Sequence, residues 1–391
     1  CGSCAIDVAT HLVDAHWRSS YMLHIGADWL SGVYLIKLIA NNQSMSYIPL
    51  VVRDDMAHSA ALAMIAVNTY QAYNLWGGYD LYGNVVGRSG LRATKVSFNR
   101  PYARSAGAGD LLYWDIQSIR WMERLGLDVR YATDVDVSTD PASLLQHQMV
   151  LTLGHHEYWT AAMRDGLTAA RDHGVSLAFL GANDGYWQVR YEPDRQGHAN
   201  RVVVCYKVAT HATDPTMRLS LDPMYAINRH LVTAQFRDPV IGEPENALIG
   251  IMYQSITRTN DDPDWVVADG NSDPFAHDAA LTAGEHIKGG LVGYEYDGGS
   301  ANGAQPSDLV VLGASPLINR YGKRQTALTT YYRADSGALV FAAGTIWWSW
   351  GLDAFTWSTD YFSANRLRGN AHISALTASL IRAMLAASPP H

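Results

Sequence analysis

The sequence predicts an α/β protein built on a doubly wound, mainly parallel sheet that follows a short β-rich segment. Two patterns lead to this fold class. From about residue 60 to residue 184, short apolar runs alternate with amphipathic stretches, as strand–helix–strand units do. Before them, residues 16–54 alternate between apolar and polar side chains, which is typical of strands joined by turns. With 48% hydrophobic and 17% charged residues, the 391-residue chain has the composition of a folded globular protein.

We expect a β-rich segment over residues 1–56 and an α/β catalytic domain over residues 57–391. Three strands are predicted in the first segment, with turns at Ala27-Asp28 and Asn41-Asn42-Gln43: HWRSSYMLHI (16–25), SGVYLIKLIA (31–40) and SYIPLVVRDD (46–55). Three short strands cannot bury a core alone. They either pack on the rest of the protein or belong to a sandwich with further strands.

The α/β part begins with buried-strand patterns and amphipathic helices in turn. The predicted strands are ALAMIAVNTY (61–70), DVRYATD (128–134), HQMVLTLGHH (147–156) and VSLAFLGAND (175–184). The predicted helices are DLLYWDIQSIRWMERLGL (110–127) and EYWTAAMRDGLTAARDHG (157–174), the second closed by Gly174.

The rest of the chain starts with a stretch rich in Pro, Asp and Asn near residues 200–285, which we interpret as an insertion. The elements predicted after it are a strand in GLVGYEYDG (290–298) that ends at Glu295, a buried strand and aromatic turn in GALVFAAGTIWWSWGLD (337–353), and a helix at about 368–387.

Several function classes are disfavoured by composition. No run of 18 uninterrupted apolar residues predicts a membrane span. The formal charge of −8 is spread along the chain, and no basic stripe indicates a nucleic-acid partner. We favour a cytoplasmic location, although the sequence carries no address. The 22 Tyr and 12 Trp against 7 Phe fit a surface for a polar ligand, but we favour plain amphipathic packing as their explanation.

Common nucleophile motifs are missing from the sequence. There is no GxSxG pattern, and no phosphate-binding glycine motif opens a helix after a strand. Cys205 stands in the apolar run RVVVCYKV, which predicts a buried structural thiol rather than a catalytic one.

Chemistry-bearing side chains do follow two of the predicted strands. His155, His156 and Glu157 come directly after one strand, and Asn183-Asp184 follow the next strand, with one helix between them. Ligands of doubly wound sheets bind beyond the carboxyl ends of the strands. We therefore treat these residues as one site.

A metal ion is a candidate ligand for this site. Adjacent residues on a turn rarely all face one ion, so the HHE sequence needs help from elsewhere. NTYQAYNLWGGYDLYG (68–83), which follows the first buried strand, offers Tyr70, Tyr73, Tyr79 and Tyr82. Phenolate and carboxylate oxygens form a hard, anionic set that suits Fe(III) better than Zn(II). The alternative, that these tyrosines only pack, remains open at this point.

The order of the motifs adds a family resemblance. The motifs are SGVYLIKL, YIPLVVRDD, NTYQAYNLWGGYDLYG, VSFNRPY, YATDVD, LGHHEYW, FLGANDGYWQVRYE, PENALIG, VGYEYD and FAAGTIWWSWGLD. Together they resemble the C-terminal region of the N,N-dimethylformamidase large (beta) subunit family, over roughly residues 16–385. The resemblance implies a sheet like that of class I glutamine amidotransferase domains, preceded by β-sandwich material. The amidotransferase nucleophile is not carried over, because GHHEYW has no Cys.

The resemblance also implies a site. The family holds a mononuclear ferric ion with two tyrosines and a glutamate, which match Tyr34, Tyr73 and Glu157. Tyr70 and Tyr79 are possible substitutes for Tyr73.

Three further residues match the family's catalytic groups: Asn183 as an oxyanion donor, Glu295 as the base, and His155 as the residue that orients the ligands. The chain departs from the family at His156, where Asp is usual, so the charge of the site is expected to differ.

The function implied is iron-dependent hydrolysis of the C–N bond of a small amide, with a metal-polarised carbonyl and a water activated by Glu295. The resemblance further implies a homo-oligomer and leaves a small partner subunit open. Two alternatives remain: a non-catalytic module that binds a ligand or glycan, and a hydrolase of a larger amide on the same scaffold.

Overall fold

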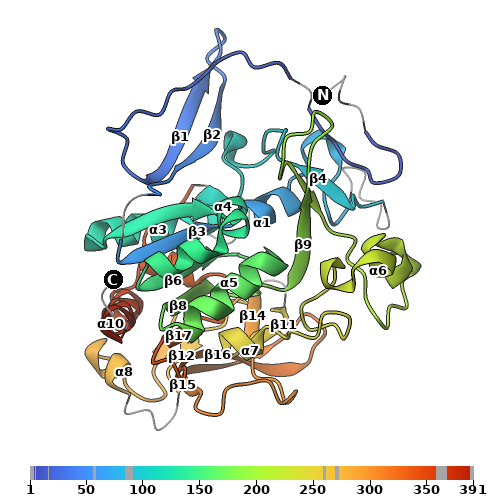
Figure 1. Cartoon of the computed structure of the whole chain (residues 1–391). Coiled ribbons are helices and arrows are strands. Elements are labelled where there is room, and N and C mark those ends of the chain that lie inside the picture. The colour runs from blue at the N-terminus through green and yellow to red at the C-terminus, as the bar shows by residue number, and fades with distance from the viewer. Residues whose placement is uncertain are drawn as a thin grey trace.

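The computed structural model describes residue 4 and residues 6–15, 17–55, 59–83, 91–258, 261–268, 273–357 and 368–387. Within these residues the chain forms a central sheet of seven strands with helices packed on both of its faces (Figure 1). The prediction of an α/β fold with a mainly parallel sheet is confirmed. The likeness to glutamine amidotransferase domains stays a prediction.

The central sheet has the strand order β15-β16-β17-β8-β6-β3-β5. Strands β17, β8, β6, β3 and β5 run parallel, while β15 and β16 add an antiparallel edge. The four strands predicted before residue 185 are all present. The bounds are β3 Ala61–Ile65, β5 Val129–Thr133, β6 Met149–Gly154, β8 Ser176–Gly181, β15 Val310–Ile318, β16 Arg324–Arg333 and β17 Leu339–Ala342.

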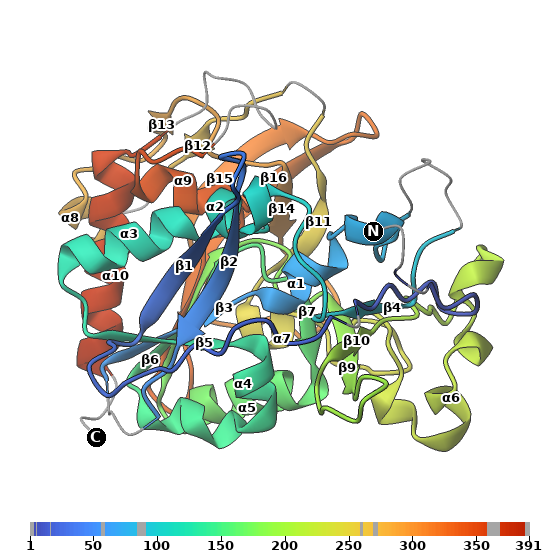
Figure 2. The same ribbon diagram turned by 90° about the horizontal axis from the view of Figure 1, so that it is seen from above.

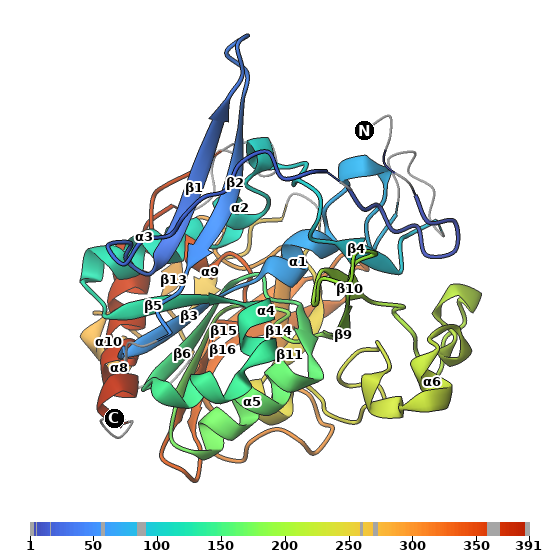
Figure 3. The ribbon, with the colours of Figure 1, turned by 45° about the horizontal axis from the view of Figure 1, so that its top comes forward.

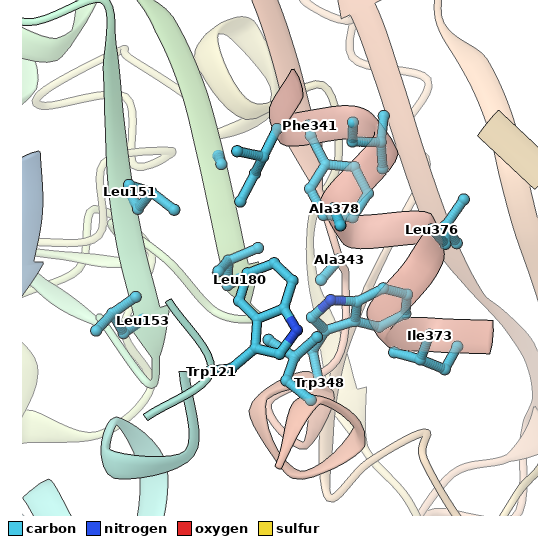
Figure 4. Packing of buried hydrophobic residues seen from close by; sticks show 14 of the residues in the cluster. Trp121, Leu151, Leu153, Leu180, Phe341, Ala343, Trp348, Ile373, Leu376 and Ala378 are labelled. Atoms are coloured by element: carbon cyan, nitrogen blue, oxygen red, sulfur yellow. The ribbon is translucent and has the colours of Figure 1, made fainter. Parts of the chain in front are cut away.

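Both faces of this sheet are buried, which explains the continuous apolar runs of its strands. Neighbouring side chains of β3 belong to different cores, Ala63 on one face and Met64 on the other. Figure 4 shows Trp121 and Trp348 between the strands and the C-terminal helix. Helices on that face are α3 (Ile116–Leu125), α9 (Trp348–Leu352) and α10 (Ala371–Ala387); those on the other face are α4 (Asp134–Thr139), α5 (Ala161–Asp172) and α7 (Asn246–Ile249).

Smaller sheets and short helices surround the central sheet. The remaining strands are β4 (Lys95–Ser97), β7 (Tyr158–Thr160), β9 (Trp187–Glu192) and β10 (Val202–Val204), which form one sheet, the pair β11 (Met252–Ile256) and β14 (Glu295–Gly298), and the pair β12 (Trp265–Val266) and β13 (His286–Ile287). The remaining helices are α1 (Val67–Ala72), α2 (Leu111–Trp114), α6 (Met224–Ile227), α8 (Pro274–Asp278), and the 3-10 helices η1 (Trp76–Gly78), η2 (Ser105–Gly107), η3 (Pro141–Gln146), η4 (Pro215–Met217), η5 (Leu219–Leu221) and η6 (Arg229–Leu231).

The β-rich start of the chain is a single hairpin, β1 (Gly32–Ile39) with β2 (Met45–Val52), which projects from the α/β body (Figures 1 and 3). Both predicted turns are confirmed. The strand predicted at 16–25 is wrong, because residues 17–25 run without a ladder partner; residue 16 lies outside the described residues. The division at residue 56 stays a prediction.

Four other boundaries differ from the prediction. The helix predicted at 110–127 is interrupted at Asp115. The helix predicted from Glu157 begins only after Thr160, whose hydroxyl accepts the N–H of Met163 at 3.2 Å and caps α5. Glu295 begins a strand instead of ending one, and the predicted aromatic turn is the helix α9. None of the described helices is long and apolar enough to cross a membrane.

The topology opens a place for a ligand between β3 and β6. The chain passes from β3 to β5, then returns past β3 to β6 and continues to β8. Doubly wound sheets bind ligands where the strand order reverses in this way. Figure 2 shows α1, which follows β3, beside β7, which follows β6. Glycines allow close approach at this edge: a Cβ on Gly181 would lie 1.9 Å from the carbonyl oxygen of its pairing partner Gly154.

Candidate active site

Glu157 lies at the reversal of the strand order, in the loop between β6 and β7. Its backbone N–H donates to the hydroxyl of Thr69 in α1 at 3.1 Å. Its carbonyl accepts the N–H groups of Tyr186 and Trp187 at 2.9 and 3.0 Å, from the segment that enters β9. Two other parts of the chain therefore hold the backbone of Glu157, a residue that is only 2% exposed.

Two phenols meet this carboxylate. The Tyr73 hydroxyl donates to Glu157 Oε2 at 2.7 Å, and the Tyr82 hydroxyl donates to Oε1 at 2.8 Å. The two phenol oxygens lie 2.8 Å apart, and their rings stack with centroids 4.6 Å apart. The Tyr82 residue is 43% exposed, so part of it reaches solvent. Three oxygen-bearing side chains thus converge on one point.

The loop after α1 is shaped to present Tyr82. The Asp80 carboxylate accepts the backbone N–H groups of Tyr82 and Gly83, each at 2.8 Å, which forms a local side-chain turn. The Arg100 guanidinium donates to the carbonyls of Trp76 and Tyr79, each at 2.9 Å. Tyr73 follows directly as the C-cap residue of α1. Hydrogen bonds within this loop therefore fix the position of Tyr82.

The structure does not bring Tyr34 to this cluster, so its predicted place beside Tyr73 and Glu157 is corrected. Tyr34 lies on β1, which pairs only with β2, and its hydroxyl donates to the carbonyl of Leu30 at 3.0 Å. Tyr82 stands where a second phenol was expected.

The two substitutes considered for a ligand tyrosine also lie elsewhere. The Tyr70 hydroxyl donates to the Asp115 carboxylate, and the Tyr79 ring stacks on His11 with centroids 4.7 Å apart.

The three predicted catalytic residues lie together next to Glu157. His155 Nε2 lies 3.1 Å from Glu295 Oε2 and 3.4 Å from Glu157 Oε2. The Asn183 amide donates to Glu295 Oε2 at 3.1 Å. Asn183 has a left-handed backbone, φ +59°, and its N–H donates to Asp297 at 2.9 Å. Loops after β6 and β8 and the first residue of β14 therefore build one site.

An aromatic wall flanks His155. The Trp114 ring approaches the imidazole edge-on with centroids 6.3 Å apart, and it stacks on Trp350 at 5.5 Å. Tyr294, the residue before Glu295, packs against Trp114 at 6.1 Å. The polar groups of the site therefore face an apolar surface on one side.

Burial and charge set the protonation of the cluster. Burial raises the pKa of the Tyr73 and Tyr82 phenols well above 10.0, and the charge of Glu157 raises both further. Burial alone would raise the pKa of Glu157, but the hydrogen bond and charge of His155 and the charge of Lys207 outweigh it and lower that pKa. Without a cation at the site, the carboxylate is ionised and both phenols keep their protons.

His155 carries the complementary positive charge. Burial would lower the pKa of its imidazole, but the charge of Glu295 and the hydrogen bonds to Glu157 and Glu295 raise it to about 10. An imidazolium between two carboxylates holds both in place.

Sequence patterns did not single out Tyr158 and Lys207, which lie behind Tyr82. The Tyr158 hydroxyl donates to the Tyr82 oxygen at 2.6 Å, and Lys207 Nζ donates to the Tyr158 oxygen at 2.6 Å. Burial lowers the pKa of Lys207 to about 8, against the opposing charge of Glu157, so the ammonium stays mostly protonated at pH 7. The sequence feature that could have indicated Lys207 is its place in the apolar run RVVVCYKV, because lysine is rarely fully buried.

His156, where the chain departs from the expected family pattern, points away from the phenols. Its Nε2 contacts the buried carboxylate of Asp134, which also accepts the backbone N–H of Asn68 at 2.8 Å. The charge that His156 adds, compared with the expected Asp, is therefore paired with the buried carboxylate of Asp134.

Comparison with protein families gives one match. The family model described as N,N-dimethylformamidase beta subunit-like, C-terminal, matches residues 2–363. The chain belongs to this family. No curated protein matches it. The family name refers to a hydrolase that cleaves an amide, and the match covers every residue of the cluster around Glu157.

The oxygen cluster fits a hard metal ion. In the described part of the chain, no group of three or more His, Cys, Asp or Glu side chains is arranged to hold a metal. A metal in this cluster would therefore use Tyr73, Tyr82 and Glu157, whose three anionic oxygens match the charge and hardness of Fe(III). Because both phenols are protonated without a cation, binding would release two protons.

The buried carboxyl of Asp115, which accepts the Tyr70 hydroxyl, should make the free energy of unfolding depend on pH. Burial raises its pKa from 3.8 to about 8, although the Tyr70 hydrogen bond opposes the shift. The folded protein thus holds a proton that the unfolded chain releases above about pH 4, so this group makes stability fall as pH rises from 4 to 8.

We expect Asp115→Asn to flatten the pH dependence of the free energy of unfolding by about 1 kcal/mol per pH unit in this window, since one proton gives a slope of at most about 1.4. Urea denaturation of metal-free protein at pH 5, 6, 7 and 8 measures it. Equal slopes for the variant and the parent protein would show that Asp115 is ionised in the fold.

Proposed function

We propose that this chain is an iron-dependent hydrolase of the C–N bond of small amides. One observation carries the proposal: the phenol oxygens of Tyr73 and Tyr82 meet both oxygens of a buried Glu157 carboxylate within 3.0 Å, and a second carboxylate, Glu295, lies one histidine away. The family match supports amide hydrolysis as the reaction class.

Tyr73, Tyr82 and Glu157 would hold the ferric ion. When bound, the ion would supply a Lewis acid that polarises the carbonyl of the amide. Its positive charge would compensate for the loss of the two phenol protons from Tyr73 and Tyr82.

Glu295 is the proposed general base. Its carboxylate takes a proton from water while the water oxygen forms a bond to the amide carbon, and it returns the proton to the amine that leaves as the C–N bond breaks. The imidazolium of His155 and the amide of Asn183 contact the same oxygen, Oε2, at 3.1 Å each. This leaves Oε1 as the atom that accepts the proton.

Asn183 and His155 hold the other reacting groups. One N–H of the Asn183 side chain orients Glu295, and its second N–H is available to the developing oxyanion, a role in which one donor contributes about 3 kcal/mol. His155 lies between the two carboxylates and keeps Glu157 turned toward the phenols. The aromatic wall around Trp114 would exclude water from the apolar part of the substrate.

A larger amide is the second candidate substrate, because the predicted insertion reaches the site. Lys207 contacts Tyr82, and Tyr253 packs edge-on against Tyr186 with centroids 5.2 Å apart. Burial raises the pKa of the Tyr253 phenol, and the charge of Glu295 raises it further. A panel of amides of increasing size separates the two substrate classes. The beta subunit-like family name also fits the proposed oligomer.

Replacement of Tyr82 by Phe tests the ligand set. We expect Tyr82→Phe to weaken ferric ion binding by more than about tenfold and to reduce the visible phenolate-to-iron absorption. The reason is that the Tyr82 phenol oxygen, one of the three proposed ligand atoms, is lost. Tyr34→Phe is the matched control and should leave both unchanged, since the Tyr34 hydroxyl is bonded to the Leu30 carbonyl. Iron titration followed by absorbance measures both. Loss of iron in Tyr34→Phe with none in Tyr82→Phe would overturn the assignment.

Replacement of Glu295 by Gln separates chemistry from metal binding. We expect Glu295→Gln to keep its iron and lose about 10²- to 10⁴-fold in the rate of amide hydrolysis, because Gln cannot take a proton from water. Glu243→Gln, at a side chain 50% exposed on the surface, is the control and should be fully active. A fully active Glu295→Gln enzyme would rule out this base.

A further inference from the structure

Lys207 is a buried cation without a carboxylate beside it. The residue is 2% exposed. In the described part of the chain, no Asp or Glu oxygen lies within 4 Å of its ammonium group. Its backbone adopts a left-handed conformation, φ +49°, which costs free energy in a residue other than glycine. A buried charge and a strained backbone at the same residue need a compensating role.

The contacts of Lys207 all lead to the Tyr82 side of the cluster. Its Nζ lies 3.3 Å from the centroid of the Tyr82 ring, 5.0 Å from that of Trp187 and 5.2 Å from that of Tyr158. Its hydrogen bond goes to the Tyr158 oxygen at 2.6 Å. The shortest of the ring contacts is thus to a proposed metal ligand.

Tyr158 connects Lys207 to the oxygen of Tyr82. Its hydroxyl accepts from Lys207 and donates to the Tyr82 oxygen at 2.6 Å. Two contacts therefore stabilise negative charge on Tyr82: the Lys207 ammonium over the face of its ring, and the hydrogen bond that Tyr158 donates to its oxygen. Within the described residues, the other phenol, Tyr73, has no such contact with Lys207.

We infer that Lys207 and Tyr158 are positioning residues that orient Tyr82 toward the metal and reduce the electron-donor strength of its oxygen. The inference rests on the proposed function and adds an asymmetry to it, in which Tyr82 is the weaker and Tyr73 the stronger phenolate donor. A cation on the ring face and a donor at the oxygen both stabilise the electrons of a phenolate. The Tyr82 phenolate is then held in one orientation as a moderate donor.

This arrangement has a spectroscopic consequence. Visible absorption of a ferric phenolate moves an electron from the phenolate to the ion. A cation against the ring lowers the energy of that electron and shifts the band to shorter wavelength. Removal of the cation should shift the band to longer wavelength without removing a ligand, which a purely structural role would not do.

The experiment compares the iron-loaded full chain with four variants. Lys207→Met removes the charge, Lys207→Arg keeps it, and Tyr158→Phe removes only the hydrogen bond to Tyr82. Lys323→Met, at an exposed lysine, is the control for the loss of one positive charge. Absorption spectra and competition with a chelator measure band position and ferric ion affinity, and circular dichroism checks folding.

We expect Lys207→Met to move the band to longer wavelength, because the charge on the ring is lost. It should also weaken iron binding by about tenfold, because Tyr82 is no longer held in one orientation. Tyr158→Phe should shift the band in the same direction by less, Lys207→Arg should restore it, and Lys323→Met should leave it unchanged. If Lys207→Met does not fold, the Tyr158→Phe band decides the question.

An unchanged band in folded Lys207→Met, or in Tyr158→Phe, overturns this inference while the proposed function stands. Absence of any visible band in the iron-loaded parent protein overturns the proposed function itself. The two failures are therefore distinguishable in one set of spectra.

Discussion

The site depends on one interaction, the burial of the Glu157 carboxylate against two phenols. A carboxylate that is removed from water needs several hydrogen bonds or positive charges to remain ionised. Here Tyr73 and Tyr82 donate to it, His155 lies 3.4 Å away, and Lys207 adds a more distant charge. The same oxygens that satisfy Glu157 in the absence of a metal are those that a hard cation would bind. For the proposed ferric ion the cluster would thus be preorganised, because its binding would need only the loss of protons.

The architecture explains how such distant residues meet. The strand order reverses between β3 and β6, so α1, the loop after β6 and the turn after β8 face one another at the carboxyl edge of the sheet. Glycines at the ends of β6 and β8 let the two strands approach closely there. The antiparallel pair β11–β14 then brings Glu295 to the same edge. The predicted insertion supplies Lys207, which contacts Tyr82 and Tyr158.

The sequence predicts part of this site well, and the physical reasons differ from residue to residue. Glu157 and Asn183 follow strongly apolar runs, so their place at the carboxyl edge could be derived from strand patterns alone. Glu295 could be placed only through the order of the family motifs, because its strand begins where a strand end was expected. The structure places Tyr34 on a hairpin that projects from the body, and a resemblance by motif does not report this position. The position of Tyr82 depends on a turn that the Asp80 side chain forms, and the periodicity of apolar residues does not predict such a turn.

The central claim is that Tyr73, Tyr82 and Glu157 bind one ferric ion. The most direct test is a crystal structure of the iron-loaded chain with anomalous diffraction collected on both sides of the iron absorption edge. We expect one iron peak per chain, in contact with the two phenol oxygens and the Glu157 carboxylate, with Glu295 nearby and not bound to it. A peak ligated by other residues, or crystals of active protein that show no iron peak at this cluster, would contradict the account.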